Sequence, residues 1–521
     1  MKALSLIYLL GIICLCEGYK FLVVFPLPGR SLNILGEGYV KHLLDAGHEV
    51  TYMSVFEPQK NHTTTNYRRI DISNNLKMFE GYNITIATVM DNSMQQKDLH
   101  LLRRFSLDTA LVTFDNVNVK KLFNDKSQKF DAVIADLYET EIYAGLAALY
   151  DCPMIWSYSM GAHYVALRII EGPTNPSYVP DYLSSNVPPL TFTQRLEELW
   201  DYIKWTYVKK FYTEPEEEEM YRNIFVPLLT ARGKKSPRYD KLVYNASLIL
   251  ANDIIAAGNV PKVPLNFKFV GGQHIETPTR PLPEHLQTLM DKSTNGVIYF
   301  SLGSTWQSKD IPKQLVDDLL RVFRSLKQTV IWKFEADLKH TPPNVHITSW
   351  APQPSILAHP NCLIFISHGG LLSFMEAVHY GVPIIGLPIY LDQFVNVNKA
   401  VAQGYALKVD LNMKLPQNLK KALHVMLKDN SYANRAKELS AIHHDALHPP
   451  SAEVVHWVEH VVRTRGAPHL RSPAHCMPWY QRIYLDFIIL IITTLVVVKI
   501  IITRLLATTK RGKKNTTKKR N

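Results

Sequence analysis

The stretch from Trp350 to Ala400 constrains the fold most, because its pattern changes from strand to turn to helix and back within fifty residues. Cys362–Ser367 is a short apolar run, which is typical of a buried strand. A Gly-Gly pair follows, residues 371–380 have helical spacing, and the glycine at 381 is typical of a helix end. Val382–Leu387 is a second apolar run. The pattern predicts a β-α-β unit of an α/β fold.

The start of this predicted helix has the features of an anion-binding site. The first N–H groups of a helix are unpaired, and its dipole is positive at that end. His368 precedes the turn, and Gly369 and Gly370 let the backbone approach a ligand closely. Ser373 adds a hydroxyl in the first turn. Glu376 lies on the same helix face and would accept hydrogen bonds from sugar hydroxyls.

Side chains on both sides of the unit extend this pattern. Trp350 ends an apolar run and could stack on a flat base, while Asp392, Gln393 and Asn396 follow the second predicted strand. A single Gly-Gly turn is usually only a turn, and a single Trp is usually core. The ordered combination is more specific, because an aromatic plate, a phosphate cradle, a ribose carboxylate and a hydroxyl-binding pair match the parts of a nucleoside diphosphate sugar in order.

With these residues, the chain resembles the UDP-glycosyltransferase family, and its membrane-bound insect members most. The signature W-x-P-Q, H-G-G, S-x-x-E-A, G-V-P and D-Q-x-x-N is filled at every position. The resemblance covers almost the whole chain. It implies an α/β fold of the GT-B type, in which two Rossmann-like domains face a cleft and the C-terminal domain holds the sugar nucleotide.

The resemblance also implies roles for the signature residues. UDP-sugar is a co-substrate of this family, so neither a cofactor nor a metal is expected. The family assigns the parts of the donor to these positions: uracil to Trp350 and Gln353, the diphosphate to His368, Gly370 and Ser373, the ribose to Glu376, and the sugar to Asp392 and Gln393. Gly369 and Asn396 belong to the same donor-binding set.

A chain of 521 residues is expected to form two domains. Prolines and glycines cluster between residues 252 and 283, and we predict an acceptor-binding domain over 19–260 and a UDP-sugar-binding domain over 261–465. A strand over Gly296–Leu302 opens the second domain. Ser304 follows this strand, and its hydroxyl would suit a phosphate oxygen.

The first domain opens with another β-α-β pattern. It consists of a strand at Phe21–Phe25, a helix over Leu35–Ala46 and a second strand over His48–Ser54. The turn between the first strand and the helix, Pro26–Ser31, has no G-x-G-x-x-G, which argues against a nicotinamide site. A later apolar strand ends at Asp136. Catalytic groups of open parallel sheets collect at such strand ends, so Asp136 is the candidate catalytic residue.

The chain departs from its family at the catalytic turn. The family usually places a histidine there, in a motif like S-H-x-I-L-G, and an aspartate at the position of Asp136 orients it. This chain has Leu32 instead, and leucine cannot accept a proton. Asp136 is then an orphaned partner, a base in its own right, or a solvated carboxylate. His163 is the nearest alternative proton acceptor along the chain.

Residues 138–239 contain several aromatic residues. They also contain an acidic run, Glu216–Glu219, which is typical of a solvated helix start. By resemblance this region shapes the acceptor pocket. Four of its aromatics could line a lipophilic cavity, although most aromatics at such spacing are core: Trp156, Tyr158, Tyr164 and Phe192.

Both ends of the chain have targeting features. Residues 1–18 combine Lys2 with a short apolar run and read as a signal peptide, with a first buried strand or helix as the alternative. Residues 483–502 are apolar enough to span a bilayer, and the basic tail, 503–521, favours the cytosol. Lys518-Lys519 resembles an endoplasmic reticulum retention signal. A plain stop-transfer patch is the alternative.

The net charge of +12 does not indicate nucleic-acid binding, because seven of the last twelve residues are Lys or Arg. Sequons at Asn61, Asn83 and Asn245 fit a lumenal glycoprotein. Cys14 and Cys16 would leave with the signal peptide. The remaining three cysteines contain no C-x-x-C, which argues against a disulfide framework or a zinc site.

We therefore predict a single-pass type I protein of the endoplasmic reticulum membrane with a lumenal catalytic body. By resemblance it would transfer a hexosyl group from UDP-glucose or UDP-glucuronate to a small lipophilic acceptor, with inversion, in a detoxification role. Two alternatives stay open: a catalytically silent protein that binds UDP-sugar or a lipophile, which Leu32 suggests, and a non-enzymatic partner or chaperone subunit of active family members in the same membrane. As an oligomer the protein would associate with itself or with other family members.

Overall fold

The computed structural model describes residues 18–58, 65–78, 86, 90, 99–172, 174–258, 261–304 and 306–517. The predicted signal peptide before Gly18, the Asn61 and Asn83 sequons and the Lys518-Lys519 pair lie outside these ranges. The contacts divide the chain into two units, Met1–Leu470 and Arg471–Asn521.

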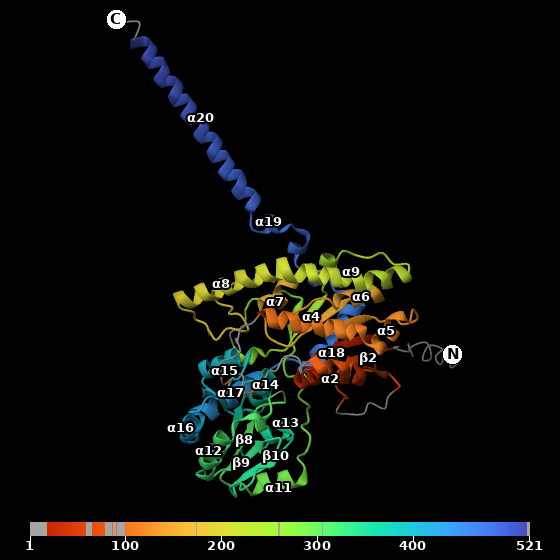
Figure 1. Ribbon diagram of the computed structural model, residues 1–521, viewed down its shortest axis with the longest axis vertical. Helices are drawn as coiled ribbons and strands as arrows, with labels where there is room; N and C mark the ends of the chain where they lie inside the picture. The colour runs from red at the N-terminus through yellow and green to blue at the C-terminus, as the bar shows by residue number, and fades with distance from the viewer. Residues whose placement is uncertain are drawn as a thin grey trace, which may run out of the picture. The chain divides into compact units, whose positions relative to one another are not determined.

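The first unit contains two parallel sheets (Figure 1). In the described residues the first sheet has seven strands in the order β3-β2-β1-β4-β5-β6-β7. The order reverses between β1 and β4, and ligands of open α/β sheets bind at the carboxyl ends beside such a reversal. The strands are β1 (Lys20–Phe25), β2 (Glu49–Ser54), β3 (Tyr67–Asp71), β4 (Ala132–Asp136), β5 (Met154–Tyr158), β6 (Leu248–Ala251) and β7 (Phe267–Phe269).

Helix α2 (Arg30–Asp45) begins five residues earlier than the sequence pattern predicts. Gly29 is extended, and its carbonyl accepts a hydrogen bond from the Asn33 N–H at 3.1 Å, so the turn after β1 is short. Leu32 consequently lies in the first turn of a helix rather than in a loop. The other helices of this half are α4 (Leu99–Asp115), α5 (Val117–Asn124), α6 (Ala144–Tyr150), α7 (Tyr164–Leu167), α8 (Phe192–Val208), α9 (Glu214–Ala231) and α10 (Tyr239–Val243).

The second sheet has six described strands in the order β10-β9-β8-β11-β12-β13. Its central β-α-β unit confirms the prediction, because β11 and α14 have the predicted bounds and Gly381 ends α14 in the left-handed region at φ 69°. The strands are β8 (Val297–Ser301), β9 (Thr329–Lys333), β10 (Val345–Thr348), β11 (Cys362–Ser367), β12 (Ile384–Gly386) and β13 (Ala406–Lys408). The helices are α11 (Glu284–Lys292), α12 (Lys313–Arg324), α13 (Gln353–Leu357), α14 (Leu371–Tyr380), α15 (Gln393–Ala402), α16 (Leu415–Lys428), α17 (Ser431–His444) and α18 (Pro450–Arg463).

The expected domain limits at residues 260 and 465 do not match the sheets. Strand β7 pairs with β6, so the first sheet continues past residue 260. Helix α18 packs on α2, and its Val454, Val458 and Val461 share a core cluster with residues of β1 and β6. The chain therefore returns to the first domain at its end. The apolar spacing of α18 predicts a buried face, but it does not say which domain covers that face.

The second unit holds α19 (Trp479–Arg482) and α20 (Leu485–Thr517). Leu485–Thr508 is a candidate membrane span of 24 residues, none of it buried. At 1.5 Å per residue this stretch is about 36 Å long, enough to cross a hydrocarbon core of about 30 Å. The predicted span, 483–502, lies almost wholly within it.

Candidate functional site

One large cleft of about 1790 Å³ lies in the first unit. Its walls include residues that follow β1 and β4 in the first sheet and β8, β11 and β12 in the second. The carboxyl ends of strands from both sheets therefore face the same space, as expected for a ligand cleft in α/β proteins.

The signature residues of the second domain form a connected group in this cleft. The Gln353 Nε2 donates to Ser373 Oγ at 3.0 Å and to Glu376 Oε2 at 2.7 Å. Gln353 starts α13, whereas Ser373 and Glu376 lie on α14. The structure thus brings together three predicted residues from two helices, and the amide holds the Glu376 carboxylate in place.

His274 also contacts this group, although no sequence motif indicated it. Its Nε2 lies 3.4 Å from Glu376 Oε1, and its side chain is only 2% exposed. Neither ring nitrogen has a hydrogen-bond partner in the described residues. The residue comes from the segment between the two sheets, where a lone histidine gives no signal of function.

The Trp350 ring lies near two cations. It is 52% exposed, with Lys333 Nζ 5.8 Å and Arg30 Cζ 6.0 Å from its centroid. Lys333 ends β9 and donates to the Gly303 carbonyl at 2.9 Å, whereas Arg30 starts α2 of the first domain. The two cations line the cleft and were missed from the sequence; only the position of Lys333 at the end of an apolar strand could have indicated one of them.

His368 is packed between two glycines. A Cβ at Gly370 would lie 2.5 Å from His368 Nε2, and one at Gly303 would lie 2.5 Å from its Cε1. Burial, assisted by the nearby Lys333 charge, lowers the pKa of His368 to about 4. The ring is therefore neutral near pH 7, and its N–H can donate into the cleft that it lines.

Two predicted donor residues support the loop instead of facing the main cleft. Gly369 has φ 92°, which favours glycine, and its carbonyl accepts a hydrogen bond from Asn396 Nδ2 at 3.1 Å. The same nitrogen donates to Asp392 Oδ2 at 2.7 Å. Neither Gly369 nor Asn396 is among the described residues that line this cleft. Their contacts hold the turn before α14 and orient Asp392.

The remaining donor candidates line the cleft: Ser304, Asp392 and Gln393. Burial raises the pKa of Asp392 to about 6, although the Asn396 hydrogen bond opposes this shift. Gln393 Oε1 accepts from the backbone N–H groups of Ile389 at 2.9 Å and Tyr390 at 3.0 Å. These bonds fix the side-chain carbonyl of Gln393, so its NH₂ group is the end that can bind a ligand.

Asp136 is buried rather than solvated. It is 2% exposed, and neither carboxylate oxygen has a hydrogen-bond partner among the residues described. Burial raises its pKa to about 8, so the carboxyl is protonated near pH 7. It is not one of the described cleft-lining residues, whereas Leu32 is. This geometry gives no support to Asp136 as a base.

His163 does not replace Asp136 as a proton acceptor in the cleft. Its Nδ1 lies 3.3 Å from the Pro180 carbonyl, and burial lowers its pKa to about 3. It lines a separate cavity of about 40 Å³ that it shares with Asn396.

The aromatics expected to line an acceptor pocket lie elsewhere. Trp156 and Tyr158 are core residues, Tyr164 packs against the core, and Phe192 is 68% exposed. The first-domain side of the cleft instead contains an apolar lobe, formed mainly by aliphatic residues and two phenylalanines: Leu27, Leu32, Phe56, Leu76, Leu101, Leu102 and Phe105. Several come from α4, whose helical spacing could not be told from that of a core helix.

Comparisons with known proteins agree with this architecture. The family model described as "UDP-glucoronosyl and UDP-glucosyl transferase" matches residues 22–520. UDP-glucosyltransferase 2 of Dactylopius coccus is 33% identical over 480 residues, which cover 91% of this chain and 89% of that protein. UDP-glucuronosyltransferase 2B1 of Rattus norvegicus is 31% identical over 375 residues, covering 71% and 68%.

The crystal structure of TcCGT1 in complex with UDP has the same fold, with a TM-score of 0.57 and 16% identity over 86% of this chain and all of that one. The predicted arrangement of two Rossmann-like domains facing a cleft is confirmed. Because the family model covers nearly the whole chain, the chain belongs to the UDP-glucoronosyl and UDP-glucosyl transferase family of sugar-transferring enzymes.

Proposed function

We propose that this protein transfers a hexosyl group from UDP-glucose or UDP-glucuronate to a small lipophilic acceptor, with inversion at the sugar carbon. The observation that carries the proposal is the group formed by Gln353, Ser373 and Glu376, which lines the same cleft as the apolar lobe of the first domain. A polar wall and an apolar lobe in one cleft suit a polar donor and a lipophilic acceptor.

The diphosphate is a good leaving group, so the main task of the protein is to stabilise its charge. Preorganised donors aimed at developing charge supply much of the rate enhancement of many enzymes. Here the N-terminal N–H groups of α14, the His368 ring and the Ser304 hydroxyl serve this purpose, with Lys333 as the nearby cation. Glu376 binds the ribose, and Asp392 with Gln393 binds the sugar.

The acceptor must attack without a histidine at the catalytic turn. A phenol or alcohol loses a proton as it attacks, and a positioned base contributes about 10²–10⁴-fold to such a step. Leu32 cannot serve as that base, and Asp136 is buried and protonated. A neutral amine has a lone pair that is already nucleophilic. We infer that amines are favoured over phenols, relative to family members that have the histidine.

A second candidate function is a silent binding protein for UDP-sugar or a lipophile. Leu32 in the cleft and the buried, protonated Asp136 favour this second function. A screen of UDP-glucose and UDP-glucuronate against phenols and amines, with the protein in microsomes, separates the two. Transfer or donor hydrolysis supports the enzyme, whereas UDP binding without any turnover supports the silent protein.

We further propose that α20 anchors the protein in the endoplasmic reticulum membrane with the body in the lumen. The support is the apolar span, the basic tail and Lys518-Lys519. Asn245 is exposed, as a glycan acceptor must be. Changing both lysines to serine should release the protein to later compartments. A wild-type protein that carries no N-linked glycan would show that the proposed topology is wrong.

A further inference from the structure

Helix α8 presents a row of large apolar side chains to the outside. The exposed fraction of each lies between 44% and 68%. Within α8 they recur at the spacing of one helix face, and η3 (Lys209–Thr213) continues the row. We call this row the outer stripe: Phe192, Leu196, Leu199, Trp200, Ile203, Tyr207, Phe211 and Tyr212.

The two buried residues of the same helix are Glu198 and Trp205, so its inward face mixes a carboxylate with one large apolar side chain. Glu198 is 2% exposed, and it accepts hydrogen bonds from the Asp181 backbone N–H at 2.9 Å, from Asn186 Nδ2 at 2.8 Å and from the Ser184 hydroxyl. A helix on a protein surface in water normally keeps most of its large apolar side chains inward. The eight that α8 and η3 expose indicate that the outer stripe faces something other than water.

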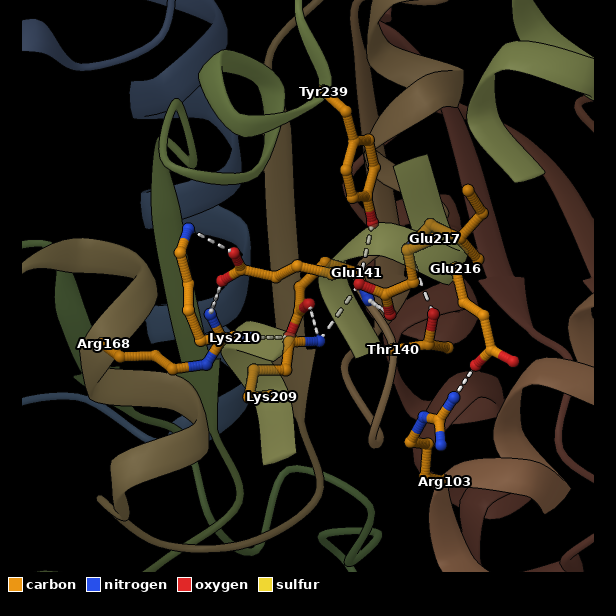
Figure 2. A network of polar contacts seen from close by, with 11 residues as sticks. Arg103, Thr140, Glu141, Arg168, Lys209, Lys210, Glu216, Glu217 and Tyr239 are labelled. Atoms are coloured by element: carbon orange, nitrogen blue, oxygen red, sulfur yellow. Dashed lines mark hydrogen bonds and ion pairs between the residues drawn. The ribbon is translucent and has the colours of Figure 1, made fainter. Parts of the chain in front are cut away.

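Buried ion pairs hold the end of α8 in this orientation (Figure 2). Lys209, at the start of the π-helical turn η3, forms ion pairs with Glu141 and with Glu217 at 3.1 Å, and Arg168 also pairs with Glu141. Glu141 and Glu217 are 1% and 0% exposed. Removing one partner of such a pair is strongly destabilising, so these contacts resist rotation of the stripe toward the core.

The acidic run Glu216–Glu219 lies near the start of α9, as expected, and Glu216, Glu218 and Glu219 are exposed; only Glu217 departs from the expected solvation. Glu217 is buried and also accepts a hydrogen bond from the Tyr239 hydroxyl at 3.2 Å, and Glu216 pairs with Arg103 (Figure 2). Figure 1 shows α8 and α9 following each other as one long helical run, with η3 between them. Lys209, at the start of this π-helical turn, is buried, whereas Phe211 and Tyr212 are exposed.

We propose that the outer stripe docks on the lipid bilayer, with its side chains at the level of the headgroups. Five of its eight members are aromatic, and Trp and Tyr are the residues enriched at membrane–water interfaces. An interfacial helix buries its apolar face about 5–10 Å into this region. Arg195 and Lys210 are exposed on the same helical run. Lys210 pairs with Glu214 at 2.8 Å, so Arg195 is the cation that would meet anionic headgroups.

The proposed membrane anchor in α20 favours the lipid bilayer as the partner of the outer stripe. Residues 471–484 connect the body to the span, and such a segment reaches about 50 Å at most when fully extended. The body is therefore held close to a bilayer, where the local lipid concentration is high. A protein partner or a second copy would need to reach the stripe in competition with the membrane.

The test is photo-crosslinking of the full-length protein in phospholipid nanodiscs. p-Benzoylphenylalanine replaces Trp200, and the control carries it at Leu447, which is 96% exposed and apolar but lies outside the stripe. We expect phospholipid adducts, identified by mass spectrometry, at position 200 and at least fivefold fewer at position 447. Equal yields at the two positions, or adducts only to a second copy or another protein, would overturn the proposal.

A second variant separates docking from folding. With the cross-linker in place of Phe192, the changes Trp200→Asp and Ile203→Asp should reduce lipid adducts at least fivefold. The midpoint of thermal unfolding should change little, because these side chains are 66% and 49% exposed. Undiminished adducts in a folded double variant would contradict docking through the stripe.

Discussion

The two domains differ in how the site residues expected from the sequence are held. In the second domain, Gln353 ties Ser373 to Glu376, and Asn396 ties Gly369 to Asp392. In the first domain, Asp136 has no hydrogen-bond partner among the described residues and Leu32 has no polar group. Polar networks that are satisfied are rigid, whereas an unpaired buried carboxyl is costly. We call the second-domain side, where the proposed donor would bind, the organised wall, and the first-domain side, which has no base at position 32, the incomplete wall.

The largest effect is expected from restoring a base to the incomplete wall. Leu32→His should raise the glycosylation rate of phenols at least tenfold, since a positioned base contributes about 10²–10⁴-fold. The rates are measured on a panel of phenols with one UDP-sugar. Leu32→Met is the matched control, because it conserves volume and adds no base. If wild type and Leu32→His react equally fast, this turn does not carry the proton transfer.

The next-largest effect is expected from removing a polar side chain of the organised wall. Glu376→Ala should weaken UDP binding by about 1–3 kcal/mol, because the ribose hydroxyls lose a charged partner. Calorimetry with UDP measures the change, and Glu376→Gln, which keeps the shape and removes the charge, should fall between. Unchanged UDP affinity in Glu376→Ala would remove the residue from the donor site.

The stability of the incomplete wall should depend on pH. The folded pKa of Asp136, about 8, lies above its ordinary value of 3.8, so the folded state binds a proton that the unfolded state lacks between these values. The stability contributed by this group therefore falls as pH rises through that window. Asp136→Asn should raise the unfolding free energy at pH 8 by about 1 kcal/mol or more.

Thermal unfolding at pH 5 and pH 8 measures this difference. At pH 5 the native carboxyl is neutral, and the amide should have a much smaller effect. An equal effect of Asp136→Asn at both pH values would mean that the carboxyl does not titrate in this range.

The smallest effect concerns the sugar end of the organised wall. Asp392 has a pKa of about 6, so it accepts hydrogen bonds from sugar hydroxyls as a carboxylate only above that pH. The loss of UDP-glucose affinity caused by Asp392→Asn should be small at pH 5 and grow a few-fold by pH 7, as measured by calorimetry. A loss of the same size at both pH values would separate Asp392 from sugar binding.

The sequence alone predicted the parts whose patterns are local. Strand β11, the turn and α14 have the predicted ends, because apolar runs, helical spacing and Gly381 act over a few residues. Three of the signature residues, Gln353, Ser373 and Glu376, contact one another in the structure. The apolar span was predictable for the same reason, since length and composition are sufficient for it.

Only the tertiary structure decided which faces of the helices and strands pack against which parts of the protein. It placed α18 on the first domain, buried Asp136 without a partner, and used Gly369 and Asn396 to support a loop. It also turned the apolar side of α8 outward, held by Lys209 and the carboxylates it pairs with. These outcomes depend on contacts between residues far apart in the chain, and a local pattern states that a face is apolar without stating what covers it.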